Sequence, residues 1–291
     1  MEYSEYKGWL SGFTREDANE FLLNIKPTIR VNEIKTNVYE FLEFSRLKLE
    51  RAVFENAFYV FDENIKLGNT IEYFLGYIHT QSLGSMLPPV VLNPRPGSKV
   101  YDVCAAPGSK TTQMAAMMKN TGIIYANDVR IERISALVNN INRLGVLNTI
   151  ITQRSGTKLL KPGYFDFVLV DAPCSGLGSS PYAYAKWQVK DSLKISGLQK
   201  QILLSSFDSL KPGGVLVYST CTYTKEENEE VIRFLLERRE NARLETINIP
   251  YEIPHETGLS EFGNEFRKVW RVYPWHLKSE GFFIAKVIRC E

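Results

Sequence analysis

Short apolar segments alternate with helix-like segments through the middle of this 291-residue chain. Within 131–144 the apolar residues recur at helical spacing, whereas 165–170 is almost continuously apolar, as expected of a strand covered on both faces. This alternation predicts an α/β fold, with a doubly wound, mostly parallel sheet and helices on both faces. The expected strands are 99–103, 122–127, 148–152, 165–170, 215–219 and 281–289, and the expected helices are 111–118, 131–144, 198–210 and 225–239.

The first eighty residues do not show the regular alternation of apolar and helix-like segments found in the rest of the chain. The elements expected there are amphipathic helices at 16–23 and 38–44 and a short strand at 28–31. Glycine and proline in 83–89 indicate a junction, and 211–214 has the composition of a turn. We therefore expect a small N-terminal α+β domain, residues 1–80, followed by a larger domain, residues 81–291.

Composition excludes several classes of protein. No apolar run is long enough to cross a membrane, and the acidic, aromatic start is not a signal peptide. The four cysteines lack the C-x-x-C pairing of a zinc site, so we expect no metal and a reducing, cytoplasmic compartment. Residues 91–224 carry fifteen Lys and Arg against seven Asp and Glu. This basic middle third suits a phosphate-rich partner, and equally a solvated lysine-bearing surface.

The segment after the first expected strand has the small residues of a ligand-binding turn. It reads DVCAAPGSKT at 102–111, which matches neither G-x-x-x-x-G-K-[ST] nor G-x-G-x-x-G. A nucleoside without a pyrophosphate fits such a turn better, and a dinucleotide oxidoreductase is set aside. Asp128 ends the second strand about twenty residues after the turn, where a carboxylate can bind ribose hydroxyls. Capping of the next helix is the alternative for Asp128.

Two cysteines each come just after the end of an expected strand. Cys174 follows the fourth strand and Cys221 the fifth, and adjacent parallel strands lie about 5 Å apart. For either cysteine alone, packing as a small apolar residue would be the plain interpretation. Together they predict two thiols facing one pocket, with a regulatory disulfide as the rival. Cys104 is expected to pack the turn, and Cys290 to be a tail residue.

These motifs resemble the Nop/Sun family of S-adenosylmethionine-dependent RNA cytosine-5 methyltransferases. The motifs are DVCAAPGSKT at 102–111, DAPCSG at 171–176, STCT at 219–222 and RVYPWHLKSEGFFIA at 271–285, with supporting matches in TIRVN at 28–32, QSLGSMLP at 81–88 and EENEEV at 226–231. The resemblance runs from about residue 27 to the end. It implies a Rossmann-like class I methyltransferase fold and no appended domain that reads an RNA end.

The resemblance also implies roles for individual residues. Cys221 would be the nucleophile that adds to C6 of cytosine, Cys174 would assist release of the product, and Lys110 and Asp171 would lie close to the target base. S-adenosyl-L-methionine would be bound by Cys104, Ala105, Ala106, Pro107, Gly108, Lys110, Asp128, Arg133, Ser155 and Asp171. C5 of cytosine is a poor nucleophile, and addition of a thiolate to C6 activates it. A cation near the thiol would lower its pKa.

The sequence departs from the family pattern at three places. Ser155 stands where an Asp usually contacts the adenine amino group. Trp275 separates Pro274 from His276, so His276 is assigned no catalytic role. In 179–194, aromatic residues and lysines interleave, either to hold splayed bases and phosphates or to pack on the sheet edge.

The expected partner is RNA, with tRNA favoured and rRNA possible, and the target cytosine would leave its stack. The front domain resembles a small RNA-binding module, although its acidic balance assigns more of the phosphate binding to the basic middle third. A monomer is the default. The rival functions are a DNA cytosine-5 methyltransferase with Cys174 as the nucleophile, and a non-catalytic RNA-binding or ribosome-assembly protein.

Overall fold

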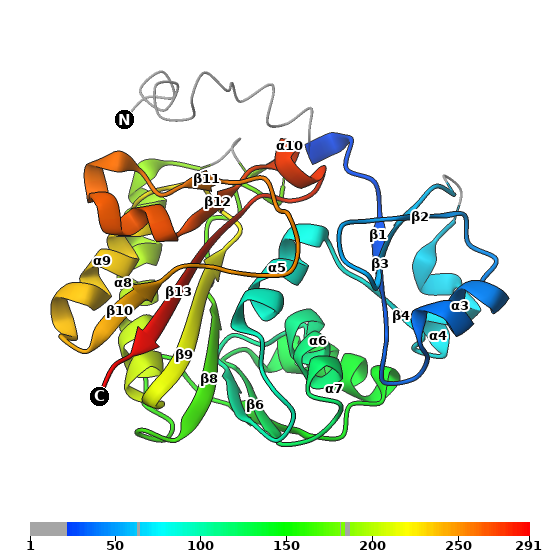
Figure 1. The fold of residues 1–291 in the computed structure, drawn as a ribbon, viewed down its shortest axis with the longest axis horizontal. Helices are drawn as coiled ribbons and strands as arrows, with labels where there is room; N and C mark the ends of the chain where they lie inside the picture. Colours follow the sequence, from blue (N-terminus) through cyan, green and yellow to red (C-terminus); the bar gives the residue numbers. More distant parts are fainter. Residues whose placement is uncertain (1–21, 63–64, 181, 184–186) are drawn as a thin grey trace.

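The computed structural model describes residues 22–62, 65–180, 182–183 and 187–291 (Figure 1). The helix expected at 16–23 therefore lies largely outside the described residues, as do Tyr184 and Lys186 of the aromatic and lysine segment. Within the described residues no helix is long and apolar enough to span a bilayer. The strands form two separate sheets.

The first sheet, called the front sheet below, is antiparallel and is formed by strands between residues 28 and 80. Its strands lie in the order β2 (Leu49–Arg51), β3 (Ala57–Val60), β1 (Thr28–Val31) and β4 (Ile78–Thr80). The helices beside it are α3 (Val38–Phe44), α4 (Ile71–Phe74) and a 3-10 turn at Leu67–Asn69. Ile29, Phe41 and Phe58 are completely buried between these elements. The strand at 28–31 and the helix at 38–44 are confirmed.

The second sheet has nine strands among the described residues and occupies the left and centre of Figure 1. Its order is β11 (Glu256–Thr257), β12 (Trp270–Val272), β13 (Phe282–Arg289), β9 (Leu210–Thr220), β8 (Phe165–Asp171), β5 (Lys99–Asp102), β6 (Ile123–Asp128) and β7 (Thr149–Gln153), with β10 (Ala242–Glu245) paired to β13. The run from β9 to β7 is parallel, and the strands beyond β9 are antiparallel. The expected mostly parallel sheet is confirmed.

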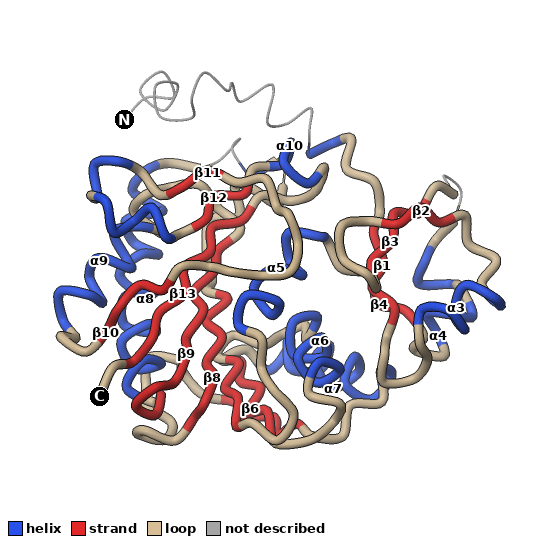
Figure 2. The backbone as a smooth tube through the Cα atoms, viewed as in Figure 1, coloured by secondary structure: helices blue, strands red, loops and turns tan. Residues whose placement is uncertain are grey.

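Helices cover both faces of this sheet, as a doubly wound fold requires (Figure 2). One face carries α5 (Leu83–Leu92), α6 (Ser109–Met117) and α7 (Ile131–Leu144), and the other carries α8 (Val189–Asp208) and α9 (Glu229–Arg238). The short α10 (Pro274–Leu277) and 3-10 turns at Ser260–Phe262 and Asn264–Lys268 complete the C-terminal part. Along β8, Leu169 packs on the first face and Val168 and Val170 on the second, which explains its continuous apolar character.

The segment expected as a junction is instead a helix. Helix α5 contains Pro88 and Pro89, which cannot donate backbone hydrogen bonds. The carbonyl of Ser85, four residues before Pro89, accepts a bond from the Gln81 side-chain amide at 3.2 Å. Ser82 caps the first turn through Ser85 N. A partner outside the helix thus replaces the missing bond, which local composition does not reveal.

Other boundaries also differ from the expectation. Helix α8 begins at Val189 rather than 198, because Gln188 and Asp191 form a capping box there. Helix α9 begins at Glu229 rather than 225. The turn expected at 211–214 lies inside the bounds of β9, where the register against β8 shifts and Gly213 has φ = 75°. The backbone therefore makes an irregular turn within β9, and the pairing with β8 resumes after it in a shifted register.

Buried polar contacts join the front sheet to the helices that cover the second sheet. Arg30 of β1 is fully buried, and it donates to Gln81 Oε1 at 2.9 Å and to Thr112 Oγ1 of α6 at 3.0 Å. Burial lowers the pKa of Arg30 to about 10. His79 of β4 contacts Ser109 Oγ at 2.8 Å, and Asn32 donates to the Leu144 carbonyl at 2.8 Å. The front sheet is therefore fixed against helices α6 and α7.

Candidate active site

Strands β8 and β9 end side by side, with Asp171 opposite Ser219. The loops that follow bring the Sγ atoms of Cys174 and Cys221 to 3.3 Å from each other. This distance is well beyond the roughly 2.05 Å of a disulfide, and all four cysteines are free. The structure thus brings together the two thiols that the strand pattern placed at one edge of the sheet.

The pKa values of the two thiols shift in opposite directions. The hydrogen bond with Cys174 lowers the pKa of the Cys221 thiol, outweighing the opposing effect of burial. The same hydrogen bond and burial raise the pKa of Cys174 well above its ordinary value. The pair therefore favours a thiolate at Cys221, which accepts the bond, and a protonated thiol at Cys174, which donates it. This is the arrangement that a nucleophile and its proton-bearing neighbour require.

An ion pair lies beside the thiols. Lys110 Nζ, on α6, is 2.8 Å from Asp171 Oδ2 and 3.0 Å from Ser85 Oγ. Burial alone would lower the pKa of Lys110, but Asp171, with contributions from Cys221 and Glu280, raises it above its usual value. Ser219 Oγ donates to the other Asp171 oxygen at 2.8 Å. Lys110 is consequently held as a fixed cation.

Glu280 is a residue of this site that the sequence did not single out. Its Oε2 accepts a hydrogen bond from Ser82 Oγ at 2.7 Å. Burial raises the pKa of its carboxyl, and Lys110 opposes that shift. Its signal in the sequence is its position directly before the GFF of the C-terminal motif.

The cofactor end is organised by Asn127 of β6, a second residue that sequence reasoning missed. Its Nδ2 donates to the carbonyls of Val103 at 2.9 Å and Arg154 at 3.0 Å. Its Oδ1 accepts from Thr152 Oγ1 at 2.9 Å and from Arg154 N at 3.1 Å. One side chain thus ties together the carboxyl ends of three strands, β5, β6 and β7.

Asp128 is buried at the end of β6. Its Oδ1 accepts from Arg130 N at 3.0 Å, as a cap would, and its Oδ2 lies 3.3 Å from Arg133 Nη1. Among the described residues Oδ2 has no hydrogen-bond partner. A buried carboxylate oxygen left in this way is a ready acceptor for a ligand hydroxyl. Arg133 also donates to the Ala106 carbonyl and so braces the turn.

The turn between β5 and α6 is made mostly of small residues. Ala105 and Ala106 are buried, and Pro107 is exposed. Gly108, the residue that caps the start of α6, has φ = 104°, which favours glycine, and a Cβ there would meet the Leu137 side chain at 2.8 Å. Burial raises the pKa of the Cys104 thiol, so this cysteine stays protonated. Ser155 Oγ is 2.8 Å from Thr157 Oγ1, after β7. The small residues of the turn, at the N-terminus of a helix, and the Asp128 oxygen together fit a nucleoside.

Glu227 anchors the loop that carries Cys174. Its carboxylate is fully buried and accepts four hydrogen bonds. The donors are Ser175 N at 2.9 Å, Gln199 Nε2 at 3.2 Å, Ser192 Oγ at 2.5 Å and Thr224 Oγ1 at 3.0 Å. Gln199 also donates to the Pro173 carbonyl at 2.8 Å. Glu227 therefore connects α8 to the loops that hold both thiols.

Replacing Glu227 with alanine is expected to lower the free energy of unfolding by about 3 kcal/mol or more, because four donors lose a buried acceptor. Urea unfolding followed by circular dichroism measures this change. Glu237→Ala is the control: this glutamate of α9 is exposed, and its loss should change the free energy by less than about 0.5 kcal/mol. Equal losses in the two variants would show that the Glu227 hydrogen bonds stabilise nothing.

The aromatic residues near the site pack mainly on one another. Trp187 Nε1 donates to Ser192 Oγ at 2.9 Å, and its ring packs with Leu177 and Tyr223. Trp275 stacks on Tyr273 with ring centroids 4.6 Å apart. His276 Nδ1 accepts from Tyr273 N at 3.1 Å, which uses this imidazole as a helix cap. Packing therefore accounts for Trp187 and Trp275.

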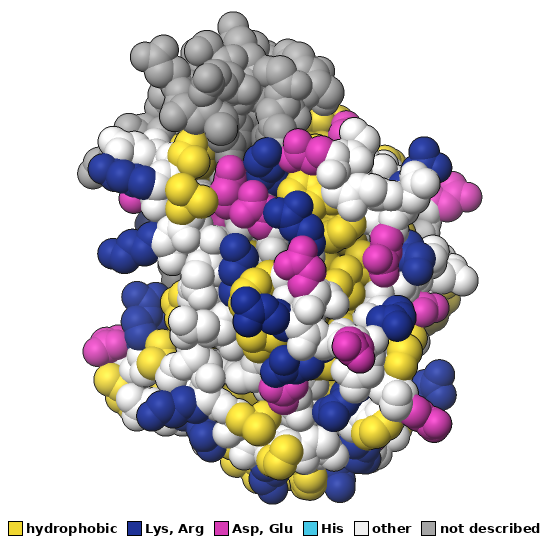
Figure 3. All heavy atoms as spheres, turned by 90° about the vertical axis from the view of Figure 1, so that its left-hand side faces the viewer, with side chains coloured by type: hydrophobic (Ala, Val, Ile, Leu, Met, Phe, Trp, Pro, Cys, Tyr) yellow, Lys and Arg dark blue, Asp and Glu magenta, His cyan; other side chains and the backbone are white. Residues whose placement is uncertain are grey.

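The lysines of α8 lie on the surface. Lys190 and Lys194 are exposed, and Tyr182 before them is 75% exposed. Figure 3 shows the side of the molecule that is on the left in Figure 1, with basic side chains spread over it and acidic ones among them. The described part of the aromatic and lysine segment thus offers exposed cations and one exposed ring. Among the described residues, no group of three His, Cys, Asp or Glu side chains is arranged to hold a metal ion.

Comparison with known proteins identifies the family to which the chain is similar. The model of the family described as 16S rRNA methyltransferase RsmB/F matches residues 89–288. The chain is 39% identical to the tRNA (cytosine(49)-C(5))-methyltransferase of Pyrococcus abyssi, over 94% of this chain and 92% of that protein. It is 43% identical to the human 28S rRNA (cytosine(4447)-C(5))-methyltransferase, over 78% of this chain but only 29% of the human protein.

Solved structures show the same architecture. A methyltransferase homologue from Pyrococcus horikoshii superposes with a TM-score of 0.81 at 34% identity, covering 94% of this chain and 89% of that one. NSun6 from Pyrococcus horikoshii, crystallised with SFG, superposes with a TM-score of 0.84 at 25% identity, covering 99% and 97%. The match thus extends over the front sheet as well as the larger one.

Proposed function

The chain belongs to the RsmB/F family of RNA methyltransferases and is an RNA cytosine-C5 methyltransferase, and from this premise we propose a reaction in which Cys221 acts as the covalent nucleophile. The observation that carries the proposal is the pair of thiols 3.3 Å apart, next to the ion pair of Lys110 and Asp171. Within this pair the pKa of Cys221 is lowered and that of Cys174 is raised.

In the proposed reaction, the Cys221 thiolate adds to C6 of the target cytosine, and a Cys–C6 bond forms. The electron pair displaced from the C5–C6 double bond makes C5 nucleophilic, and C5 then takes the methyl group as the bond between that group and its donor breaks. The proton on C5 leaves to a base, the double bond returns, and the Cys–C6 bond breaks to release the thiolate. Cys174 donates its hydrogen bond to that departing sulfur. Lys110 and Asp171 hold the cytosine ring.

We also propose S-adenosylmethionine as the methyl donor, in keeping with the SFG, an analogue of it, in the NSun6 crystal. When bound, it supplies an electrophilic methyl group. Asp128 would accept from the ribose hydroxyls, and the turn from Cys104 to Gly108, followed by Lys110, would enclose the nucleoside. Arg133 would fix that turn, Asp171 would border the methyl group, and Ser155 would lie near the adenine.

Asp128→Asn is expected to raise the Kd for S-adenosylmethionine about ten- to hundredfold, because a charged acceptor of the ribose hydroxyls becomes a neutral one of the same shape. Calorimetric titration measures the Kd. The control is Asp166→Asn, at the opposite end of β8, where the carboxylate pairs with Lys211. An unchanged Kd in Asp128→Asn would remove Asp128 from the cofactor site.

We propose tRNA as the substrate, because the archaeal relative that this chain nearly spans is named for tRNA. Residues 1–80 would act as a small RNA-binding domain, and residues 81–291 as the catalytic domain. The reaction needs free thiols, which favours a reducing, cytoplasmic compartment. A monomer stays a prediction.

Incubation of the protein with labelled S-adenosylmethionine and separated tRNA and rRNA tests this function. We expect label in 5-methylcytosine of the tRNA fraction. Label in rRNA alone would contradict the choice of tRNA, and label in neither fraction would contradict the activity.

A further inference from the structure

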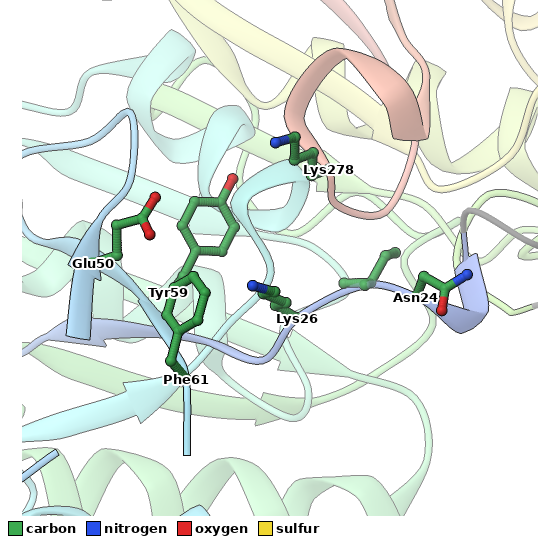
Figure 4. Close-up of a pocket in the computed structure, with 7 residues that line it drawn as sticks. Asn24, Lys26, Glu50, Tyr59, Phe61 and Lys278 are labelled. Carbon is green, nitrogen blue, oxygen red and sulfur yellow. The ribbon is translucent and has the colours of Figure 1, made fainter. Parts of the chain in front are cut away.

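A pocket of about 450 Å³ lies between the front sheet and the C-terminal part of the larger domain (Figure 4). Its lining on one side comes from the front sheet and the residues next to its strands: Lys26, Glu50, Tyr59 and Phe61. On the other side, Lys278 lines it from the end of α10. Tyr59 Oη donates to the Leu277 carbonyl at 3.0 Å and so joins the two walls. The pocket is therefore built on elements that already contact each other.

The lining combines aromatic rings with cations. Phe61 is 39% exposed, and Lys26 Nζ lies 3.5 Å from the centre of its ring. In Figure 4, Lys278 lies across the pocket from Tyr59. Rings of this kind stack on bases, and lysines bind phosphates, whereas the Glu50 carboxylate can accept from an exocyclic amino group. These complementary groups match one unpaired nucleotide.

A short stretch of chain connects the pocket wall to the site that holds the two thiols. Lys278 is two residues from Glu280, and two residues span at most about 7 Å. Glu280 in turn acts electrostatically on the pKa values of Lys110 and Cys221, and Lys110 and Asp171 act on the pKa of Glu280. A cytosine flipped toward Cys221 would leave its neighbours in the strand within reach of the pocket wall.

We propose that this pocket binds a single-stranded RNA nucleotide that flanks the target cytosine, with its base against Phe61 and Tyr59 and its phosphate on Lys26 and Lys278. The proposal rests on the proposed function, because the strand is oriented by the cytosine at Cys221. It gives the front sheet a specific RNA contact despite the acidic balance of residues 1–90.

Fluorescence anisotropy with a short, labelled, single-stranded RNA that contains one cytosine tests the proposal. We expect Phe61→Ala to raise the Kd about tenfold through loss of stacking, and Lys26→Ala to reduce the salt dependence by about one phosphate contact. The control is Phe74→Ala: this ring of the front domain is 75% exposed on α4, outside the pocket, and its loss should leave the Kd within twofold.

Three outcomes overturn the proposal: a Kd for Phe61→Ala within twofold of wild type together with an unchanged salt dependence in Lys26→Ala, equal losses in Phe61→Ala and Phe74→Ala, or no binding of the RNA by the wild-type protein. Methyl incorporation into bulk RNA by the wild-type protein is measured in parallel. Incorporation together with any of these outcomes removes the pocket alone, whereas absence of incorporation contradicts the proposed function itself.

Discussion

Replacing Cys221 with alanine is expected to lower methyl transfer to RNA by about four orders of magnitude or more. Without a thiolate to add to C6, C5 of cytosine keeps its aromatic character and does not attack the methyl group. The hydrogen bond between the two thiols lowers the pKa of Cys221 and raises that of Cys174, so Cys221 is the more readily ionised of the pair. Initial rates with labelled S-adenosylmethionine at saturating RNA measure the loss.

Two controls accompany this variant. Cys290→Ala changes an exposed cysteine at the tail and should keep the wild-type rate. Cys221→Ala itself should bind S-adenosylmethionine with an unchanged Kd, since Cys221 follows β9 and the proposed cofactor residues all lie at or after the ends of β5, β6, β7 and β8. A rate above a tenth of wild type in Cys221→Ala would show that another group activates the cytosine.

Replacing Cys174 with alanine is expected to trap a covalent complex between protein and RNA. The raised pKa of Cys174 keeps its proton available for the hydrogen bond to the Cys221 sulfur, and a hydrogen-bond donor stabilises that sulfur as it leaves C6 as a thiolate. Without the donor, the last step slows more than the first, and the methylated intermediate accumulates. Denaturing electrophoresis of protein incubated with RNA and S-adenosylmethionine should then show a slowly migrating band holding most of the protein.

The double variant that lacks both thiols is the control for this experiment and should form no such band. The reverse pattern, with an adduct in Cys221→Ala and none in Cys174→Ala, would assign the nucleophile to Cys174. That assignment is the one expected for an enzyme of the DNA cytosine-5 type.

The edge that carries both thiols could be predicted from the sequence for a simple reason. Strands β8 and β9 are marked by apolar runs, and the carboxyl ends of parallel strands meet at one edge of a sheet. Two cysteines that follow such strands therefore approach each other whatever the details of the loops. The same reasoning places Asp128 at the end of β6, beside the turn after β5.

The supporting residues could not be predicted, because their roles depend on distant partners. Glu227 and Ser175 are 52 positions apart, and no local spacing relates them. The side chain of Asn127 forms hydrogen bonds with residues at the ends of both neighbouring strands. Nothing next to it in the sequence distinguishes it from an asparagine on the surface. Helix α5 was missed likewise, since Gln81 lies outside the helix whose missing bond it replaces.

Mass spectrometry of a trapped complex tests the central claim most directly. RNA that carries 5-fluorocytosine at the target position blocks loss of the group at C5, so the intermediate persists on the wild-type protein. Digestion should leave the modified nucleotide attached to the peptide that contains Cys221, with Cys174 unmodified. Attachment to Cys174, or turnover of the RNA without any protein adduct, would contradict the account.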